Sequence, residues 1–292
     1  TGSGGWPMSI FMTAKQMPFY AGTYFPPVNR SGMMGFRELL LEINKLWKQK
    51  RAGLLQSAEQ ILSQIDTNAG NSEDKLQKRA GKAIDSGLPG QAAELFTRSF
   101  DKNYGGFGSA PKFPTPHNLI FLMLYSGIGL DDKWYQVEKT LEQMRRGGIF
   151  DHIGYGFSRY STDRFYLVPH FEKMLYDNAL LMIAYAAAFK ISKENMFLDT
   201  AEKTAEYILR EMTGPDGEFY SAQDADSEGR EGLYYIWDYE EICNILGREK
   251  GEEFCSYFGI SEKGNFEGKN IPNLLNGNPI SDKFHKEKKL LY

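Results

Sequence analysis

The spacing of apolar residues along the chain predicts a short hairpin followed by a succession of helices. Pro7 to Met12 is an apolar run of strand length, and Phe19 to Phe25 is a second run beyond the turn Ala14 to Pro18. From Gly35 to Ile65 the apolar residues recur at helical spacing, and Gly53 suggests a break between two helices. The first 65 residues therefore combine a strand pair with helix.

The remainder of the chain has helical periodicity interrupted by long loops rich in glycine and aromatic residues. A polar stretch, Asp66 to Lys82, precedes it and predicts a linker and domain boundary. A β-hairpin is expected from Glu218 to Ala222 and Gly232 to Trp237. Three loops resemble one another, which favours stacked helical hairpins. The predicted helices are Gln91 to Phe100, Pro116 to Tyr125, Lys133 to Arg146, Pro169 to Ile191, Phe197 to Met212 and Tyr239 to Leu246.

Composition excludes several classes of protein. The 292 residues are 41% hydrophobic, enough for a sizeable core, and a net charge of -4 argues against a nucleic-acid partner. The longest apolar run, Ala179 to Phe189, is too short to span a membrane. Cys243 and Cys255 lack a second pair or a histidine cluster, so we expect no zinc site or disulfide framework. The N-terminal residues lack the features of a signal peptide, so we expect a reducing, cytoplasmic location.

The segment from Gly147 to Leu181 carries most of the candidate chemistry, including two of the four histidines. Mixed titratable and aromatic residues on a loop leading into a helix are typical of a ligand-facing cleft. His117 and His170 each follow a proline that could begin a helix, where a first-turn imidazole would stay neutral. Either histidine could instead simply bond a neighbouring loop.

Spacing along the helix predicted from Pro169 places His170, Lys173 and Asp177 on one polar face. Glu172 is left out of this set, because a first-turn glutamate is already explained by the helix dipole. Four further residues on the preceding loop could orient a polyhydroxylated ligand, or equally could hold the loop together through ion pairs. They are Asp151, Arg159, Asp163 and Arg164, together with the imidazole of His152.

The acidic turn from Asp224 to Arg230 begins like a calcium-binding loop but has Tyr235 where a bidentate glutamate is required. A calcium site is therefore not expected, and no other metal or cofactor is indicated. Asp224 and Asp226 remain a carboxylate pair near the rings of Tyr220, Tyr234, Tyr235 and Trp237, an arrangement that glycoside chemistry uses. The alternative is a plain solvated turn.

Four stretches of the chain closely resemble the spermatogenesis-associated, thioredoxin-domain protein family, whose bacterial members include the YyaL type. The stretches are GSGGWPMSIFMTAKQMPFYAGTYFPP, GGFGSAPKFPTPHNL, GGIFDHIGYGFSRYSTDRFYLVPHFEKMLYDNALL and FYSAQDADSEGREGLYYIW. The resemblance implies a mainly α chain, in which the C-terminal part of a thioredoxin-like α/β domain precedes a partial α/α toroid of the six-hairpin glycosidase class. The expected divisions are residues 1–65, a linker at 66–82, and the toroid at 83–292.

The resemblance also implies that Pro7 is the cis-proline of the thioredoxin fold. The family's Cys-x-x-Cys element precedes GSGGWP, so this chain as written is expected to have no thiol-disulfide activity. Sugar epimerases and glycoside hydrolases share the toroid, which favours a carbohydrate or polyol ligand.

Two functions remain open from the sequence. In the first, the toroid acts on a carbohydrate by general acid/base catalysis, as a hydrolase or an epimerase. The expected catalytic residues are His152, His170, Asp163, Asp177, Asp224 and Asp226, with Asp151, Arg159, Arg164, Lys173, Tyr220 and Trp237 as substrate-binding residues. In the second, the toroid is a non-catalytic binding or scaffold body, and redox chemistry belongs to relatives that keep the cysteines.

Overall fold

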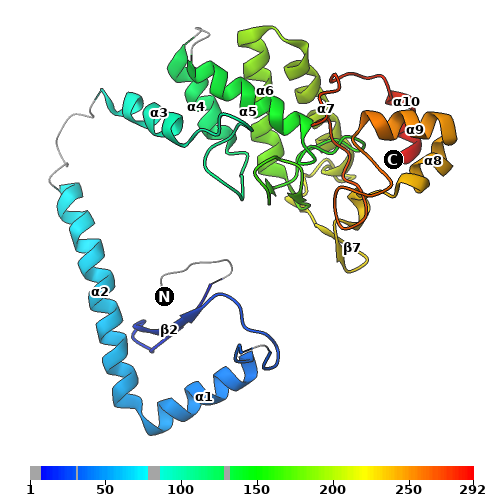
Figure 1. Ribbon diagram of the computed structural model, residues 1–292. Coiled ribbons are helices and arrows are strands. Elements are labelled where there is room, and N and C mark those ends of the chain that lie inside the picture. The colour runs from blue at the N-terminus through cyan, green and yellow to red at the C-terminus, as the bar shows by residue number, and fades with distance from the viewer. Residues whose placement is uncertain (1–7, 31, 78–85, 128–131) are drawn as a thin grey trace. The chain divides into compact units, whose positions relative to one another are not determined.

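The computed structural model describes residues 8–30, 32–77, 86–127 and 132–292, and it divides into two compact units, residues 1–84 and 85–292 (Figure 1). Pro7 lies outside the described residues, so its predicted cis peptide bond lies outside them too. The division falls just after the linker that the sequence predicts at 66–82. Part of that stretch is helical, since α2 continues to Gln77.

The first unit contains the predicted hairpin and two helices. Strands β1 (Ser9–Met12) and β2 (Pro18–Gly22) pair antiparallel, with Ser9 opposite Gly22. Helix α1 (Phe36–Gln49) is followed by α2 (Arg51–Gln77), which contacts both α1 and β2. The predicted break at Gly53 is wrong: the chain leaves the helix at Lys50, because a single glycine weakens a helix by only about 1 kcal/mol.

The second unit begins with two layers of helices. Helices α4 (Pro116–Ser126) and α6 (Leu175–Ser192) contact each other and carry apolar side chains on all sides. Helices α3 (Leu88–Ser99), α5 (Asp132–Arg146) and α7 (Asn195–Glu211) are amphipathic and contact α4 or α6. An inner layer of mostly apolar helices flanked by amphipathic ones is the arrangement of an α/α toroid, and the mainly α fold class is confirmed.

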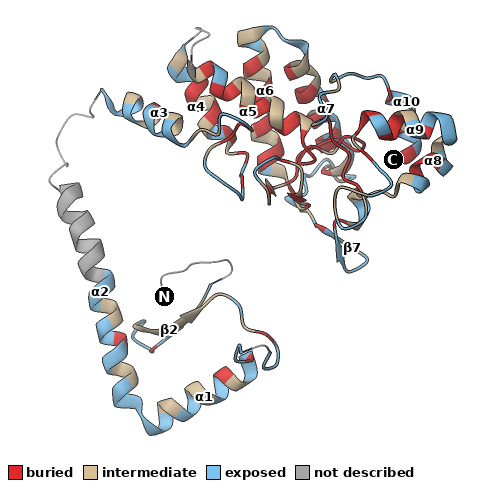
Figure 2. Ribbon diagram, in the orientation of Figure 1, coloured by how far each residue is buried: buried red, intermediate tan, exposed pale blue. Residues whose placement is uncertain are grey.

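The core of these helices is fully closed to solvent, as the buried segments in Figure 2 show. Side chains with no exposed surface come from both layers, whereas Leu124 of α4 and Ile183 of α6 remain exposed. The side chains with no exposed surface include Leu119, Leu122, Val137, Leu141, Leu181, Ala184 and Tyr185.

The C-terminal part of the unit has its own core. Helices α8 (Tyr239–Leu246), α9 (Arg248–Tyr257) and α10 (His285–Leu291) enclose a cluster that includes Phe254, Phe258 and Phe284. Asp238 and Glu241 form a capping box that begins α8, which fixes the chain directly after Trp237. A short 3-10 helix, η1 (Leu233–Tyr235), precedes it.

Short strands tie the loops beneath the helices together. Strand β3 (Tyr160–Ser161) pairs with β4 (Pro169–His170), β5 (Lys173–Met174) with β6 (Ala222–Gln223), and β7 (Asp226–Ser227) with β8 (Arg230–Glu231). The predicted hairpin between 218–222 and 232–237 is therefore wrong. Residues 222–223 pair with β5, and the acidic turn closes on itself.

The helix predicted from Pro169 to Ile191 begins at Leu175, six residues later than expected. From Pro169 to Met174 buried and half-buried residues alternate strictly, as in a strand with one buried face. Phe171 and Lys173 are buried, whereas His170 and Glu172 are half-buried. The antiparallel pairing of β4 with β3 and of β5 with β6 holds this segment extended, so the proline does not begin a helix.

Candidate functional site

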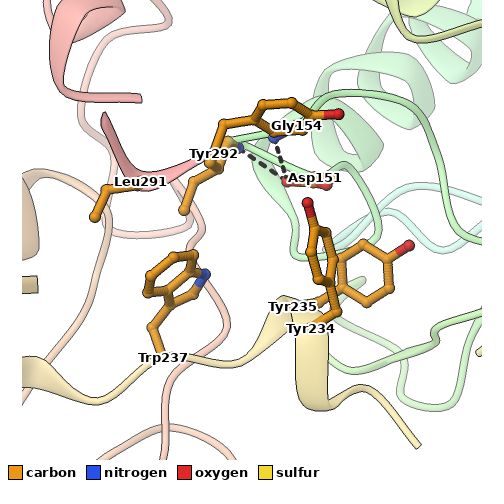
Figure 3. Close-up of a pocket in the computed structure, with 8 residues that line it drawn as sticks. Asp151, Gly154, Tyr234, Tyr235, Trp237, Leu291 and Tyr292 are labelled. Atoms are coloured by element: carbon orange, nitrogen blue, oxygen red, sulfur yellow. Dashed lines mark hydrogen bonds between the residues drawn. The ribbon is translucent and has the colours of Figure 1, made fainter. Parts of the chain in front are cut away.

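A cavity of about 130 Å³ opens among residues from three parts of the second unit (Figure 3). The loop after α5 contributes a carboxylate, the segment from η1 to α8 contributes three rings, and α10 contributes its last residues. We call this cavity the aromatic pocket. Its lining residues are Asp151, Ile153, Gly154, Tyr234, Tyr235, Trp237, Leu291 and Tyr292.

Asp151 is held by partners on both of its carboxylate oxygens. Oδ1 accepts hydrogen bonds from the backbone amides of Ile153 and Gly154, each at 2.9 Å. Oδ2 lies 2.9 Å from the ammonium of Lys173. Because each carboxylate oxygen can accept two hydrogen bonds, Oδ2 keeps the capacity to accept one more.

Lys173 is buried beneath the aromatic pocket. Its ammonium also donates to the Tyr155 carbonyl at 2.8 Å and lies 4.6 and 4.7 Å from the ring centres of Tyr207 and Tyr235. Burial lowers the pKa of Lys173, and the nearby Asp151 carboxylate opposes that shift. The contacts make an internal ion pair whose cation is covered by rings.

The same arrangement occurs a second time, in the loop after α3. Lys112 Nζ lies 2.8 Å from Asp101 Oδ2 and 2.6 Å from the Gly105 carbonyl, and its ammonium faces the Tyr166 ring. A bridge joins Phe100 to Phe107 in this loop, as Phe150 is joined to Phe157 in the loop after α5. Two of the three loops that resemble one another in sequence therefore share one structure, built on a half-buried aspartate and a buried lysine.

Several sequence-predicted site residues meet on the other face of the segment 169–174. His170 Nδ1 lies 2.6 Å from Glu231 Oε1, and Arg159 Nη1 lies 2.6 Å from Glu172 Oε2. We call this group, together with Asp177, the His170 cluster. His170 lies in β4 and stacks on Tyr160 at 5.1 Å, so its predicted place in a helical first turn is wrong.

Asp177 is the buried member of the His170 cluster. Its Oδ2 has no hydrogen-bond partner, and burial raises the pKa of its carboxyl to about 6, although Arg159 opposes the shift. His170 and Asp177 do not share a helical face with Lys173, because the helix begins only at Leu175. Glu172 and Glu231, absent from the predicted site, belong to the cluster.

His152 is buried away from these groups. Its Nε2 lies 3.0 Å from the Gly147 carbonyl oxygen, and its Nδ1 lies 3.4 Å from a guanidinium nitrogen of Arg145. Burial, together with the charge of Arg145, holds the pKa of His152 well below its usual value. The hollow that this side chain lines has a volume of about 10 Å³, room for a water molecule at most.

Asp163 and Arg164 hold their own loop. The Asp163 carboxylate accepts hydrogen bonds from the backbone amides of Phe165, Leu167 and Val168. Arg164 pairs with Asp101 at 3.0 Å. Arg164 thus forms an ion pair of the kind that the alternative interpretation of this loop expected, whereas Asp163 holds the loop through backbone hydrogen bonds.

The remaining predicted residues lie at the surface or at a helix start. Asp224 Oδ1 accepts the amide of Asp226 in the exposed turn at β7, and Tyr220 is exposed outside the lining of the aromatic pocket. His117 lies in the first turn of α4, as predicted, and is also exposed. Of the predicted set, Asp151 and Trp237 line the aromatic pocket, and Lys173 is paired with Asp151. His170, Arg159 and Asp177 belong to the His170 cluster.

The fold and a family match define the class of this chain: a thioredoxin-like segment followed by a body of helical hairpins. Residues 1–66 match the Thioredox_DsbH family, described as "Protein of unknown function, DUF255". Spermatogenesis-associated protein 20 of Homo sapiens is 38% identical over 92% of this chain, and the uncharacterized protein B0495.5 of Caenorhabditis elegans is 35% identical over 91%. The resemblance to the spermatogenesis-associated, thioredoxin-domain family is thereby confirmed.

The chain spans 36% of the length of the human relative and 38% of the nematode one. Among solved structures, cellobiose 2-epimerase from Bacillus thermoamylovorans is similar with a TM-score of 0.41 and 14% identity, covering 45% of this chain and 37% of the enzyme. A likeness of that size carries no argument about activity.

Two further observations concern the described residues alone. No helix there combines the length and the apolar character needed to cross a membrane. Within the same ranges, no group of three or more histidine, cysteine, aspartate or glutamate side chains is placed to hold a metal ion.

Proposed function

We propose that the second unit binds a carbohydrate or a similar polyol in the aromatic pocket. The observation that carries the proposal is the convergence of Tyr234, Tyr235 and Trp237 with the Asp151 carboxylate around one cavity. Ligand pockets are commonly lined by rings with a few polar groups that fix orientation. Rings can cover the apolar face of a sugar, while a carboxylate oxygen accepts its hydroxyl protons.

Binding is better supported than hydrolysis at this pocket. Hydrolysis needs two carboxylates on opposite sides of the scissile bond. Asp151 is tied to Lys173 and to two amides. Glu211, which lines an adjoining hollow, accepts from Arg210 and Tyr292. The pocket therefore offers a rigid acceptor and a stacking surface.

The experiment is a calorimetric titration of the chain with a panel of neutral mono- and disaccharides, repeated on two variants. Tyr234→Ala removes a ring that lines the pocket, and Tyr220→Ala removes a similarly exposed ring outside it. We expect Tyr234→Ala to weaken sugar binding by about tenfold, and Tyr220→Ala to leave it unchanged. Equal binding by all three proteins, or no binding by any, would contradict the proposal.

A second candidate, acid/base catalysis at the His170 cluster, is favoured by one observation. Asp177 has an unpartnered oxygen and a pKa of about 6, which suits a group that exchanges protons near neutral pH. Its test is turnover of any sugar that binds, followed by NMR for the wild type and for Asp177→Asn. Turnover unaffected by Asp177→Asn would exclude this role.

A further inference from the structure

A second cavity, of about 180 Å³, lies beside the aromatic pocket and has a different chemical character. Four of its lining residues are basic or imidazole side chains, and one is acidic. We call it the basic cavity. Its lining residues are Ile153, Tyr155, Glu206, Arg210, His285, Lys288, Lys289 and Tyr292.

Lys288 is the unusual member of this lining, because its side chain is only 3% exposed. Its ammonium lies 5.6 Å from the ring centre of Tyr155 and 5.0 Å from that of Phe258. Within the described part of the chain, no carboxylate lies at ion-pair distance from it. Buried lysines are rare unless paired, so this cation lacks the partner that its burial calls for.

The two carboxylates that act on the charge of Lys288, those of Asp199 and Asp282, are already paired with other cations. Asp199 Oδ1 and Asp282 Oδ1 each lie 2.5 Å from Lys203 Nζ, and Asp199 Oδ2 lies 3.5 Å from Arg145. Burial, with the charges of Arg145 and Lys203, lowers the pKa of Lys288 to about 7. The two cations and the two carboxylates near Lys288 are paired with one another, so the charge of Lys288 itself has no counter-ion among the described residues, which favours a negative ligand.

The other charged groups that line the basic cavity do not neutralise the charge of Lys288. Glu206 is offset by Arg210 at 3.5 Å, and Arg210 also pairs with Glu211 at 2.8 Å. Lys289 and His285 are exposed, and neither is paired with a carboxylate among the described residues. The cavity thus combines one buried cation with two surface groups that have free donors.

We propose that the basic cavity binds an oxyanion, a phosphate or carboxylate group, with Lys288 as its buried partner and with Lys289 and His285 beside it. The bound anion supplies the charge that Lys288 lacks. A charge-assisted hydrogen bond to a buried lysine contributes more binding free energy than one to a solvent-exposed lysine, because the local dielectric constant is lower.

The position of the cavity also specifies the ligand, a step that rests on the proposed function. Ile153 and Tyr292 line both the basic cavity and the aromatic pocket, so the two adjoin. A sugar whose ring lies against Tyr234 and Trp237 could carry its acidic group toward Lys288. The preferred ligand is therefore a sugar phosphate or a sugar acid, which should bind more tightly than a neutral sugar.

The test uses inorganic phosphate first, then glucose, glucose 6-phosphate and glucuronate, titrated calorimetrically at about pH 6.5, below the lowered pKa of Lys288. Lys288→Met removes the buried charge at similar length, and Lys286→Met is the control from an exposed position of the same helix. We expect phosphate to bind the wild type and Lys286→Met alike, and Lys288→Met at least about tenfold more weakly.

The outcomes of this titration distinguish the anion site from sugar binding in the aromatic pocket. Absence of phosphate binding, or equal binding by Lys288→Met, overturns the anion site even if neutral sugars bind the aromatic pocket. Phosphate binding that depends on Lys288, with glucose 6-phosphate and glucuronate no tighter than phosphate, keeps the anion site and overturns its link to the sugar. Tighter binding of glucose 6-phosphate or of glucuronate identifies the acidic group. A cooperative thermal transition of Lys288→Met verifies that this variant is folded.

Discussion

The Lys173 ammonium lies 2.9 Å from Asp151 Oδ2 beneath the aromatic pocket, and Lys112 is paired with Asp101 in the same way one hairpin earlier. In each loop the aspartate accepts two backbone amides with its other oxygen, and the lysine donates to a carbonyl of the loop. Asp151 thus owes its fixed position to a loop structure that the fold uses twice.

Removing the cation of this pair is expected to destabilise the second unit. Lys173→Met leaves the Asp151 carboxylate partly buried without its counter-ion, which typically costs about 3–5 kcal/mol. Lys190→Met, at an exposed position of α6, should change the free energy of unfolding by less than about 0.5 kcal/mol. Urea unfolding of both variants decides the point, and a loss below about 1 kcal/mol for Lys173→Met would refute it.

The raised pKa of Asp177 predicts a pH-dependent effect of Asp177→Asn. Between the ordinary value of 3.8 and about 6 the folded state holds more protons than the unfolded one. Stability due to this group therefore falls as pH rises through that window, and the charged form is unfavourable above it. Asp177→Asn should raise the free energy of unfolding by about 1–3 kcal/mol at neutral pH and by little at pH near 4.

Thermal denaturation of Asp177→Asn at several pH values measures this difference. Asp224→Asn, at an exposed carboxylate, is the control and should show no such dependence on pH. A stabilisation by Asp177→Asn that is the same at both ends of the range would contradict the assignment.

Gly156 has a backbone conformation and a contact that exclude a side chain. Its φ is +77°, and a Cβ there would lie 2.4 Å from the buried ring of Tyr207. Gly108 has a φ of +78° with no atom near the Cβ position. Gly108→Ala should cost about 1–2 kcal/mol for the left-handed backbone alone, and Gly156→Ala about 3–5 kcal/mol because overpacking is added. Chemical unfolding compares them, and equal losses would show that Tyr207 yields without cost.

Lys288 should make the chain more stable as pH rises above neutrality. Its folded pKa of about 7 is below the ordinary 10.5, so between these values the unfolded state binds more protons and stability rises with pH. Lys288→Met should remove that slope, whereas Lys286→Met should retain it. A slope that survives in Lys288→Met would assign it to another group near this side chain. The titratable and charged groups there are Arg145, His152, Lys203, Asp199, Asp282 and Tyr155.

Much of the fold could be predicted from the sequence because it follows from local periodicity. The helices α4, α5 and α7 lie within two residues of their predicted limits, since their apolar residues recur regularly over many turns. Local periodicity does not explain the loop glycines. A Cβ at Gly148, for example, would lie 2.2 Å from the carbonyl oxygen of Leu167, a contact between distant parts of the sequence. The alternation from Pro169 to Met174 is one of burial and not of hydrophobicity, because Lys173 is buried and Met174 is half-buried, so the sequence pattern did not predict it.

The candidate site could be predicted only in part, because pairing across long separations decides it. Asp151 and Trp237 are 86 positions apart and meet through the packing of the loops. Tyr234 and Tyr235 belong to a conspicuous aromatic run that could have been added to Trp237. No local pattern indicated Lys288, because what sets it apart is burial among rings without a carboxylate partner in the ranges that the structure describes, and both features arise only from the tertiary structure.

The indole N–H of Trp237 provides the most direct measurement of ligand binding in the aromatic pocket. Its NMR resonance, assigned with Trp237→Phe, is followed while the best-binding sugar of the calorimetric panel is added. Trp47, in the first unit, serves as an internal reference. We expect a saturable shift of the Trp237 resonance with the calorimetric Kd and no shift for Trp47, whereas an unmoved Trp237 resonance at saturating sugar would contradict binding in the aromatic pocket.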